Sequence, residues 1–429
     1  MTLTPTIDNT RIAVIGLGYV GLPLAAALSS HFSVTGLDIS SERVTALRAG
    51  RDDNGELGDD ELPALQQMQL TDVVADVAEC TVFIIAVPTP VDAGKLPDLQ
   101  PLRSASRMVA GVLKRGDVVI YESTVYPGAT EEICVPELEA ASGLRFNVDF
   151  FCGYSPERIN PGDRQRRIAD IVKITSGSTP ETAQFVDQLY RRIIRAGTHL
   201  APSIRVAEAA KAVENTQRDL NIAFANELSM MFHRMGIDTE EVLKAAETKW
   251  NFMPVRPGLV GGHCIGVDPY YLIHKAEEVG AAPMLIRSAR VINEQMSAHV
   301  FSRLLQAMAA KGIAMHSARV LMLGLSFKEN CADLRNTRVI ELIAQARQQG
   351  AMVDVHDPWA SPGEARHEHG LELLERLPDR ADYDVIVVAV AHRQFAELGV
   401  DGIRRLARSP SVIFDVKGMF PRGQFDGRL

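Results

Sequence analysis

The sequence predicts an α/β protein with two Rossmann-like doubly wound parallel-sheet domains joined by a long central helical domain. Three observations support this. A buried strand near the N-terminus runs into a glycine-rich turn and a helix, residues 204–235 have helical periodicity, and the last third repeats the alternation of strands and helices. We expect a first sheet domain at 1–200, a central helical domain at 201–310 and a second sheet domain at 311–429.

The composition is that of an ordinary globular protein. A chain of 429 residues, 46% of them hydrophobic, is long enough for several domains with their own cores. A net charge of −9 is not typical of nucleic-acid-binding proteins, so an anionic ligand would need local cations and amides. The five cysteines contain no C-x-x-C pair, which indicates neither a disulfide framework nor a metal site: Cys80, Cys134, Cys152, Cys264 and Cys331.

No segment suggests a membrane or an export signal. Residues 1–10 lack a basic region followed by an apolar core, and apolar runs such as 82–87 are too short to span a bilayer. We therefore expect a cytoplasmic protein that contacts neither membrane nor nucleic acid.

The first third has the pattern of a dinucleotide-binding site. Residues 11–15 form a predicted strand that leads into the motif Gly16-Leu17-Gly18-Tyr19-Val20-Gly21. Gly16 would make the turn, Gly18 would admit a pyrophosphate at the helix N-terminus, and Gly21 would allow close packing. A second strand, 32–38, ends in Asp38, whose carboxylate would accept from ribose hydroxyls and repel a 2′-phosphate, which favours NAD over NADP. Asp38 could instead cap the next helix, or do both.

Further strands are predicted at 81–87, 118–121, 148–152 and 171–175. The loops after two of them, 87–90 and 122–128, would lie over the cofactor and bring Pro88, Thr89 and Thr124 there, although the prolines could simply mark turns. The segment 153–162 follows another strand and carries Glu157 and Arg158. A solvent-exposed Glu157 is an equally good interpretation.

The predicted central helix carries two polar residues on one face. Lys211 and Asn215 are four residues apart and are surrounded by alanines, so desolvation could make Lys211 a base or an oxyanion partner. A surface lysine paired with Glu208 or Glu214 is the alternative. Long central helices often carry a dimer interface, and we expect a homodimer. A shorter helix is predicted at 239–247.

Residues 257–269 contain four glycines around Cys264. Glycine permits positive φ and close backbone approach, so the loop could hold one thiol for nucleophilic attack. A small buried hydrophobic residue is the alternative, since most lone cysteines are of that kind.

The last third has predicted strands at 318–325, 352–356, 385–390 and 412–416, with a helix at 337–349. It contains no GxGxxG motif, so a second NAD is not expected. Four cations follow the strand ends and could hold a nucleotide, although each alone could be a surface charge: Lys328, Arg335, Arg338 and Lys417.

Taken together, these motifs resemble the UDP-glucose/GDP-mannose dehydrogenase family over nearly the whole chain. The similarity is carried by GxGxxG at 16–21, Ser155-Pro156-Glu157-Arg158, Glu208-Ala209-Ala210-Lys211 with Asn215, Gly261-Gly262-His263-Cys264 and Phe327-Lys328-Glu329-Asn330. Within the family the chain is similar to the bacterial branch that acts on UDP-N-acetylhexosamines for surface polysaccharide. His263 and Ile265 point away from UDP-glucose members, which usually have serine and phenylalanine there.

The resemblance implies oxidation of C6 of a UDP-sugar by two NAD, with a thiohemiacetal and then a thioester on the cysteine. It implies the catalytic residues Cys264, Lys211, Asn215, Asp268, Glu157 and Thr124. It implies an NAD site at Gly16, Gly18, Tyr19, Val20, Gly21, Asp38, Arg43, Pro88, Thr89 and Thr124. It also implies a UDP-sugar site at Glu157, Arg158, Lys211, Asn215, Arg256, Gly261, Lys328 and Arg338.

We expect UDP-N-acetylglucosamine as the substrate. The same chemistry on UDP-N-acetylgalactosamine, UDP-N-acetylmannosamine or UDP-glucose remains an alternative, because epimers differ by a few polar contacts. A two-electron β-hydroxyacid-type dehydrogenase would share the glycine-rich sheet and the lysine helix, and a non-catalytic regulator would need only the binding sites.

Overall fold

A computed structural model describes residues 6–159, 166–379 and 381–429. Residues 160–162 of the loop predicted at 153–162, and residues 1–5 of the N-terminal segment, lie outside the described residues. The chain divides into a first unit, residues 1–214 with 270–281, and a second unit, residues 215–269 with 282–429. The predicted three-part division stays a prediction.

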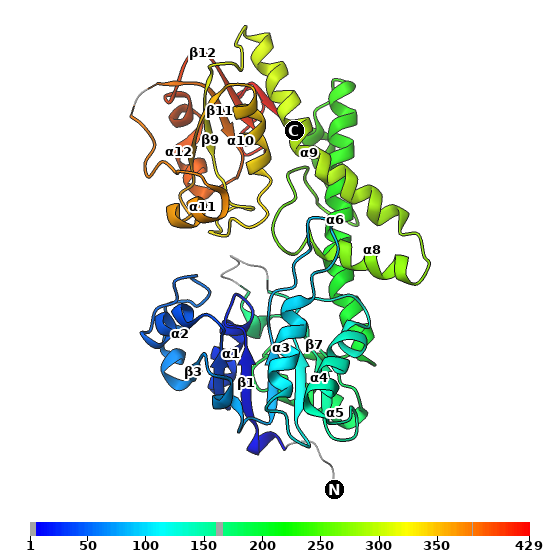
Figure 1. Cartoon of the computed structure of the whole chain (residues 1–429). Helices are drawn as coiled ribbons and strands as arrows, with labels where there is room; N and C mark the ends of the chain where they lie inside the picture. Colours follow the sequence, from blue (N-terminus) through cyan, green and yellow to red (C-terminus); the bar gives the residue numbers. More distant parts are fainter. Residues whose placement is uncertain (1–5, 160–165, 380) are drawn as a thin grey trace. The chain divides into compact units, whose positions relative to one another are not determined.

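The first unit contains a six-stranded parallel sheet in the order β3-β2-β1-β4-β5-β6 (Figure 1). This is the strand order of a dinucleotide-binding fold, with the reversal between β1 and β4. Its strands are β1 (Arg11–Ile15), β2 (Ser33–Leu37), β3 (Gln69–Thr71), β4 (Val82–Ile85), β5 (Val118–Tyr121) and β6 (Phe151–Tyr154). Its helices are α1 (Gly21–Ser29), α2 (Ser41–Arg48), α3 (Gln100–Ala110), α4 (Val135–Ser142) and α5 (Pro180–Arg191).

Two sequence predictions in this unit need correction. Residues 173–175 form β7, but β7 pairs with β8 (Thr198–Leu200) in a separate two-stranded sheet and not in the main sheet. The strand predicted at 148–152 begins only at residue 151, because Asn147 has a left-handed φ of +58° and the chain turns before it. Short helical turns complete the unit: η1 (Ile7–Asn9), η2 (Leu62–Gln67), η3 (Val74–Val77), η4 (Thr130–Cys134) and η5 (Ile168–Asp170).

The second unit contains a five-stranded parallel sheet in the order β10-β9-β11-β12-β13. The strands are β9 (Arg319–Leu323), β10 (Met352–His356), β11 (Tyr383–Val388), β12 (Ala407–Asp415) and β13 (Gly427–Arg428). The helices are α7 (Thr239–Glu247), α9 (Met284–Ala310), α10 (Val339–Gln348), α11 (Pro362–His369) and α12 (Arg393–Arg404). Two further helices, α6 (Ile204–Arg234) and α8 (Asp268–Glu278), contribute residues to both units. Helix α9 was not predicted from the sequence.

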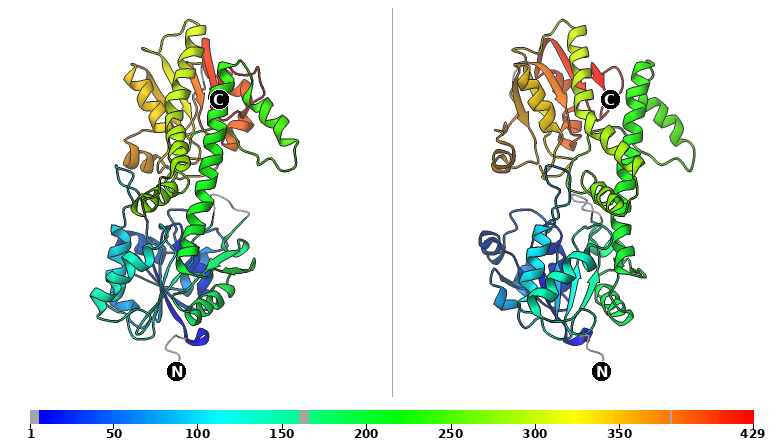
Figure 2. Two further views of the ribbon diagram at one scale, coloured as in Figure 1. Left: turned by 90° about the vertical axis from the view of Figure 1, so that its right-hand side faces the viewer. Right: turned by 45° about the vertical axis from the view of Figure 1, so that its right-hand side comes forward.

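Alternate residues of each strand in the second sheet enter different cores, as the period of two requires. In β9, Val320 and Met322 face a core shared with α9 and α10, whereas Leu321 and Leu323 face a core shared with α12. Figure 2 shows α9 beside the part of α6 that belongs to this unit, and hydrogen bonds join the two helices. The second sheet is therefore covered on both faces.

None of the helices in the described part of the chain combines the length and the apolar character that crossing a bilayer requires.

Candidate active site

The glycine-rich turn after β1 has the geometry that a dinucleotide needs. Gly16 has φ +92°, and its amide donates to the carbonyl of Leu37 at 2.8 Å. A Cβ on Gly21 would lie 1.8 Å from the Gly16 carbonyl oxygen, so only glycine fits there. Among the described residues no atom lies within 4 Å of a Cβ built on Gly18, which leaves space for a pyrophosphate at the start of α1. These residues fit NAD.

Asp38, at the end of β2, holds this turn and keeps acceptor capacity. One of its oxygens accepts from the Leu17 amide at 2.7 Å and the other from the Ser40 amide at 2.9 Å. Ser40 is the N-cap residue of α2 and accepts from the Arg43 amide, so the alternative that Asp38 caps this helix is wrong. A carboxylate has about four acceptor positions, so ribose hydroxyls can still bind.

Arg43 contacts the backbone of the glycine-rich turn. Its guanidinium donates to the carbonyl of Leu17 at 3.2 and 3.1 Å and pairs with Asp52 at 2.8 Å. This geometry supports a positioning role for Arg43. Val20 is the N-cap residue of α1 and is 8% exposed, and Tyr19 precedes it in the same turn.

The loops after β4 and β5 are joined to each other. The Thr89 hydroxyl donates to the carbonyl of Thr124 at 2.7 Å, and the Ser123 hydroxyl donates to the carbonyl of Val87 at 2.6 Å. Tyr271 donates to the carbonyl of Thr89 at 2.8 Å. Thr89 and Thr124 therefore lie together at the carboxyl end of the sheet, with Pro88 beside them in the chain, as predicted for ligand-binding loops.

Glu208 fixes the far end of the second of these loops. It lies fully buried on α6 and accepts from the amides of Gly128 at 2.5 Å and Thr130 at 2.9 Å. Burial raises the pKa of Glu208 to about 7. Glu208 is therefore not the surface partner of Lys211 that the sequence left open, and Lys211 is itself buried.

Glu157 belongs to a buried cluster that the sequence did not predict. One oxygen accepts from the amides of Arg158 at 2.6 Å and Ile159 at 2.7 Å, and the other lies 3.2 Å from Nζ of Lys173. Lys173 also donates to Glu122 at 2.7 Å. The alternative of a solvated Glu157 is wrong, because the side chain is 7% exposed.

Charge balance in this cluster depends on burial and on one lysine. Burial raises the pKa of Glu122 to about 7, and the Tyr190 hydroxyl donates to the same carboxyl. Burial opposes the charge on Lys173, but Glu122 and Glu157 outweigh it and raise the pKa of that lysine. A charged residue within an apolar strand pattern at 171–175 was the signal for this lysine in the sequence.

Arg158 is engaged within the first unit. Its guanidinium pairs with Glu214 at 2.7 Å and donates to the carbonyl of Val172 at 2.5 Å. These contacts place it among structural ion pairs, so a substrate role for Arg158 stays a prediction.

Residues 257–269, which we call the cysteine loop, form a tight turn at the start of α8. The amides of Val267 and Asp268 donate to the carbonyl of Cys264 at 3.1 and 2.8 Å. Cys264 is half-buried, whereas the other four cysteines are buried. A thiol meant to meet a substrate needs this partial exposure.

Asn215 and Asp268 meet directly in the second unit. The Asn215 carboxamide donates to the Asp268 carboxylate at 2.6 Å, and both side chains are buried. An amide nitrogen has two N–H groups, so Asn215 retains a second donor. Lys211 precedes Asn215 by four residues on α6.

Glycines allow this loop to approach the segment that follows β9 in the second unit. A Cβ on Gly261 would lie 2.7 Å from the carbonyl oxygen of Asn336, and one on Gly262, where φ is +80°, would lie 2.8 Å from the Phe327 ring. Asn336 donates to the carbonyl of Gly262 at 3.4 Å. The predicted need for glycine is confirmed at both positions.

His263 is oriented by neighbours from the loop after β9. Its Nδ1 lies 3.3 Å from Asp333, and its ring stands edge-on to Phe327 at 6.1 Å between centroids. Asp333 also pairs with Arg335 at 2.7 Å. Burial opposes ionisation of Asp333, but Arg335 and His263 lower its pKa below the ordinary value. Arg335 is thus committed to this pair.

The remaining predicted cations have different surroundings. Nζ of Lys328 lies over the Phe327 ring at 5.5 Å, and Nζ of Lys417 lies 3.4 Å from a Cβ built on Gly258. Arg338 donates to the carbonyl of Val260 at 3.4 Å and pairs with Glu294 at 3.4 Å. These three side chains contact or approach the cysteine loop and its neighbours in the second unit.

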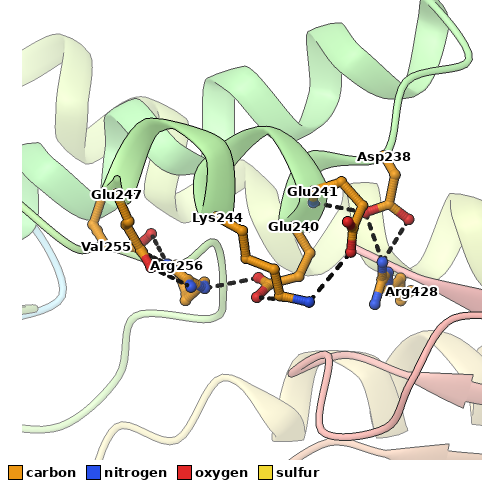
Figure 3. A network of polar contacts seen from close by, with 8 residues as sticks. All are labelled: Asp238, Glu240, Glu241, Lys244, Glu247, Val255, Arg256 and Arg428. Carbon is orange, nitrogen blue, oxygen red and sulfur yellow. Dashed lines mark hydrogen bonds and ion pairs between the residues drawn. The ribbon is translucent and has the colours of Figure 1, made fainter. Parts of the chain in front are cut away.

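Arg256, like Arg338 with Glu294 and Glu341, is paired with two acids, which in this case both belong to α7. It pairs with Glu240 at 2.7 Å and with Glu247, as Figure 3 shows. Hydrogen bonding to Glu247 raises the pKa of Arg256. At the other end of α7 Arg428 pairs with the N-cap residue Asp238 at 2.5 Å. A direct substrate role for Arg256 would require it to leave these carboxylates.

The comparison with protein families covers most of the chain. Residues 10–194 match the NAD binding domain of the UDP-glucose/GDP-mannose dehydrogenase family, residues 205–295 its central domain, and residues 321–422 its UDP binding domain.

Individual relatives match end to end. The chain is 55% identical to a UDP-N-acetyl-D-glucosamine 6-dehydrogenase of Pseudomonas aeruginosa, covering 98% of this chain and 100% of the relative. It is 50% identical to a UDP-N-acetyl-D-glucosamine 6-dehydrogenase of Salmonella typhi, covering 99% of each. Among solved structures, a UDP-D-ManNAc dehydrogenase from Pyrococcus horikoshii superposes with a TM-score of 0.88 at 34% identity, covering 98% of each chain.

Proposed function

Because the chain belongs to the UDP-glucose/GDP-mannose dehydrogenase family, we propose that this NAD-dependent dehydrogenase oxidises UDP-N-acetylglucosamine at C6 to the uronic acid. The observation that carries the substrate is the end-to-end identity of 55% and 50% with two UDP-N-acetyl-D-glucosamine 6-dehydrogenases. The half-buried thiol of Cys264 in its glycine loop supports a covalent route to the acid.

The proposed reaction proceeds in balanced steps. The C6 hydroxyl loses its proton and C6 loses a hydride to give an aldehyde. The thiolate of Cys264 adds to the aldehyde carbon, and the oxygen takes up a proton to form a thiohemiacetal. Loss of the hydroxyl proton and of a second hydride from the thiohemiacetal leaves a thioester, and hydrolysis by water gives the carboxylate, the restored thiol and a proton. When bound, NAD accepts one hydride in each of the two oxidations.

Several residues assist the reaction at Cys264. Asn215 uses its second N–H and Lys211 its ammonium to stabilise the oxyanion. Asp268, held by Asn215 at 2.6 Å, exchanges protons with Lys211 through water. Thr124 orients the hydrolytic water. Glu157 accepts two amides and contacts Lys173, which favours a role in orienting that water over a role as the base.

The substrate-binding residues follow from the second unit. We assign Lys328 and Arg338 to the UDP-sugar phosphates and Gly261 to close contact with the sugar, since all three lie on or beside the cysteine loop. Arg256 joins them only if substrate draws it away from Glu240 and Glu247. Arg158 orients the segment around Glu157.

Turnover and stoichiometry test the proposal. Purified protein should form two NADH per uronate, with kcat/KM highest for UDP-N-acetylglucosamine among this sugar, its two epimers named above and UDP-glucose. Cys264→Ser should stop steady-state uronate formation, whereas Cys331→Ser, at the other cysteine of the second unit, should not. Undiminished uronate formation by Cys264→Ser would refute the covalent route, and one NADH per substrate would favour a two-electron dehydrogenase.

We further propose a homodimer through the second unit. Large apolar side chains on α6 and α9 are exposed there, among them Phe224 at 52%, Met231 at 46% and Val291 at 52%. An apolar face of this kind fits a second copy of the chain. Light scattering should give twice the monomer mass, and Phe224→Glu should lower the measured mass.

The free cysteines fit a reducing cytoplasm, where the product would supply surface polysaccharide such as capsule.

A further inference from the structure

Four buried polar side chains connect α6 and α9 next to the cysteine loop. We call them the polar chain: Asn226, Asn293, Asp219 and Arg290. Each is at most 2% exposed. Buried polar groups cost free energy unless they are paired, and two helices could pack with apolar side chains at least as stably. Their presence therefore calls for a reason other than helix packing.

One end of the polar chain holds the start of the loop. The Asn226 carboxamide donates to the carbonyl of Gly258 at 3.1 Å and accepts from the Gly258 amide at 2.8 Å. These two hydrogen bonds engage both backbone polar groups of Gly258 and so fix the two peptide groups that meet at this residue. Asn226 also donates to Asn293 at 2.8 Å, which fixes the carboxamide itself.

The other end reaches the last glycine of the loop. Asn293 donates to the backbone carbonyl of Asp219 at 3.0 Å and to its carboxylate at 2.7 Å, and that carboxylate lies 3.4 Å from Nε of Arg290. A Cβ built on Gly266 would lie 3.8 Å from Nη1 of Arg290. The polar chain thus hydrogen-bonds Gly258 at one end and lies near Gly266 at the other.

We propose that the polar chain positions Cys264 by fixing the start of the cysteine loop at Gly258 and by placing Arg290 next to Gly266, so that the thiol keeps one orientation. The kinetic consequence rests on the proposed function, because it assumes that Cys264 bonds to the substrate. None of the four residues needs to touch the substrate, and we regard them as positioning residues. Small displacements of a reacting atom lower rates strongly, so a released loop should slow catalysis.

The test measures the loop without substrate and then with it. Asn226→Ala removes the contact to Gly258, and Asn293→Asp keeps the acceptor for Asn226 but loses the donor to Asp219. Gln217→Glu, on the exposed side of α6, is the control for an added carboxylate. Iodoacetamide labelling of Cys264, followed by peptide mass spectrometry, reports loop order in each variant. Labelling should become several-fold faster in the first two variants and stay unchanged in Gln217→Glu.

Kinetics and binding separate positioning from general damage. In Asn226→Ala and Asn293→Asp, kcat should fall about tenfold or more, which corresponds to about 1.4 kcal/mol. The NAD dissociation constant should stay within about twofold in both variants, since the glycine-rich turn belongs to the first unit. Unchanged labelling in both variants would overturn the proposal, even if kcat or the melting temperature fell.

Failure of the proposed function would look different. If the wild-type protein formed no NADH with any of the four UDP-sugars, the proposed substrate class would be wrong. The labelling comparison would still decide whether the polar chain orders the loop, because it needs no substrate.

Discussion

The two parallel sheets share a backbone plan but differ in what their first turn can hold. In the first sheet the Gly16 amide donates to the last residue of β2, and in the second the Gly324 amide donates to the last residue of β10, both at 2.8 Å. The two glycines have φ +92° and +93°. After this shared turn the chains diverge, because Gly18 leaves open space whereas Ser326 is fully buried.

The acids that follow the second strands show the same divergence. Asp38 accepts one backbone amide on each oxygen, but Asp357 accepts four, from Leu325 and Ser326 on one oxygen and Trp359 and Ala360 on the other. Asp357 also lies 3.1 Å from the buried His392. Asp357 therefore uses both oxygens for contacts within the fold, whereas Asp38 keeps acceptor positions for the NAD ribose that we propose as its ligand.

The largest expected effect is at Asp357. Asp357→Ala would leave His392 and four amides without their partner, and breaking a buried pair of this kind costs about 3–5 kcal/mol. Asp38→Ala should cost less than about 1 kcal/mol, since no ion pair joins Asp38 to another described residue and its two amide contacts are partly exposed. Urea unfolding monitored by circular dichroism measures both. Equal losses would break the comparison.

Glycine substitutions should come next and should separate binding from stability. Gly21→Ala places a Cβ 1.8 Å from the Gly16 carbonyl and should weaken NAD about 100-fold, or about 2.7 kcal/mol. Gly324→Ala in the second sheet would meet Val390 at 2.5 Å and lower the melting temperature while NAD affinity is kept. Calorimetric titration with NAD and thermal melts distinguish these outcomes. Loss of NAD binding in Gly324→Ala would contradict the assignment of NAD to the first sheet.

A smaller effect is expected for the cofactor preference. Asp38→Ala should weaken NAD about tenfold, or about 1.4 kcal/mol, and reduce the discrimination against NADP, because the carboxylate no longer repels a 2′-phosphate. The measurement is kcat/KM for both cofactors. UDP affinity, as the control, should be unchanged. An unaltered NAD to NADP ratio would remove Asp38 from the site.

The smallest expected effect is on the pH dependence of stability. Its sign is opposite for Glu208 in the first unit and Asp357 in the second. Burial raises the pKa of Glu208 from 4.5 to about 7, so the folded state binds more protons than the unfolded state in that window and stability falls as pH rises through it. Burial would also raise the pKa of Asp357, but His392 and the amides outweigh it and lower the pKa below 3.8. The contribution of Asp357 is therefore complete above that value and lost as pH falls below it.

Two amide substitutions test these signs. Glu208→Gln should lower the free energy of unfolding more at pH 5 than at pH 8. The two losses should differ by about 1 kcal/mol, a figure that allows for hydrogen bonds that the glutamine does not reproduce. Asp357→Asn should destabilise more at pH 7 than at pH 3. Urea midpoints at each pH give the comparison, and the same sign in both variants would contradict the stated causes.

Much of the fold and part of the site followed from the sequence. We could predict strand β1, the turn at Gly16 and helix α6 because their signals are local. These signals are the spacing of apolar residues along the chain and the position of the glycines. The sequence also indicated Cys264, since glycines on both sides of one cysteine leave a local signal. Helix α9 was missed. Strand β7 was placed in the wrong sheet, because strand pairing depends on residues that are distant in the chain.

What the tertiary structure decided was the use of each polar group. Sequence alone left Glu157 open between a solvated and a buried side chain, and Lys173, Asp219 and Asn293 had no assigned role. Hydrogen bonds between residues far apart in the chain determine which donor meets which acceptor, and local pattern contains no record of them. The sequence by itself determined the turn for the dinucleotide and the loop for the thiol, whereas only the packing of helices and strands decided what holds them in place.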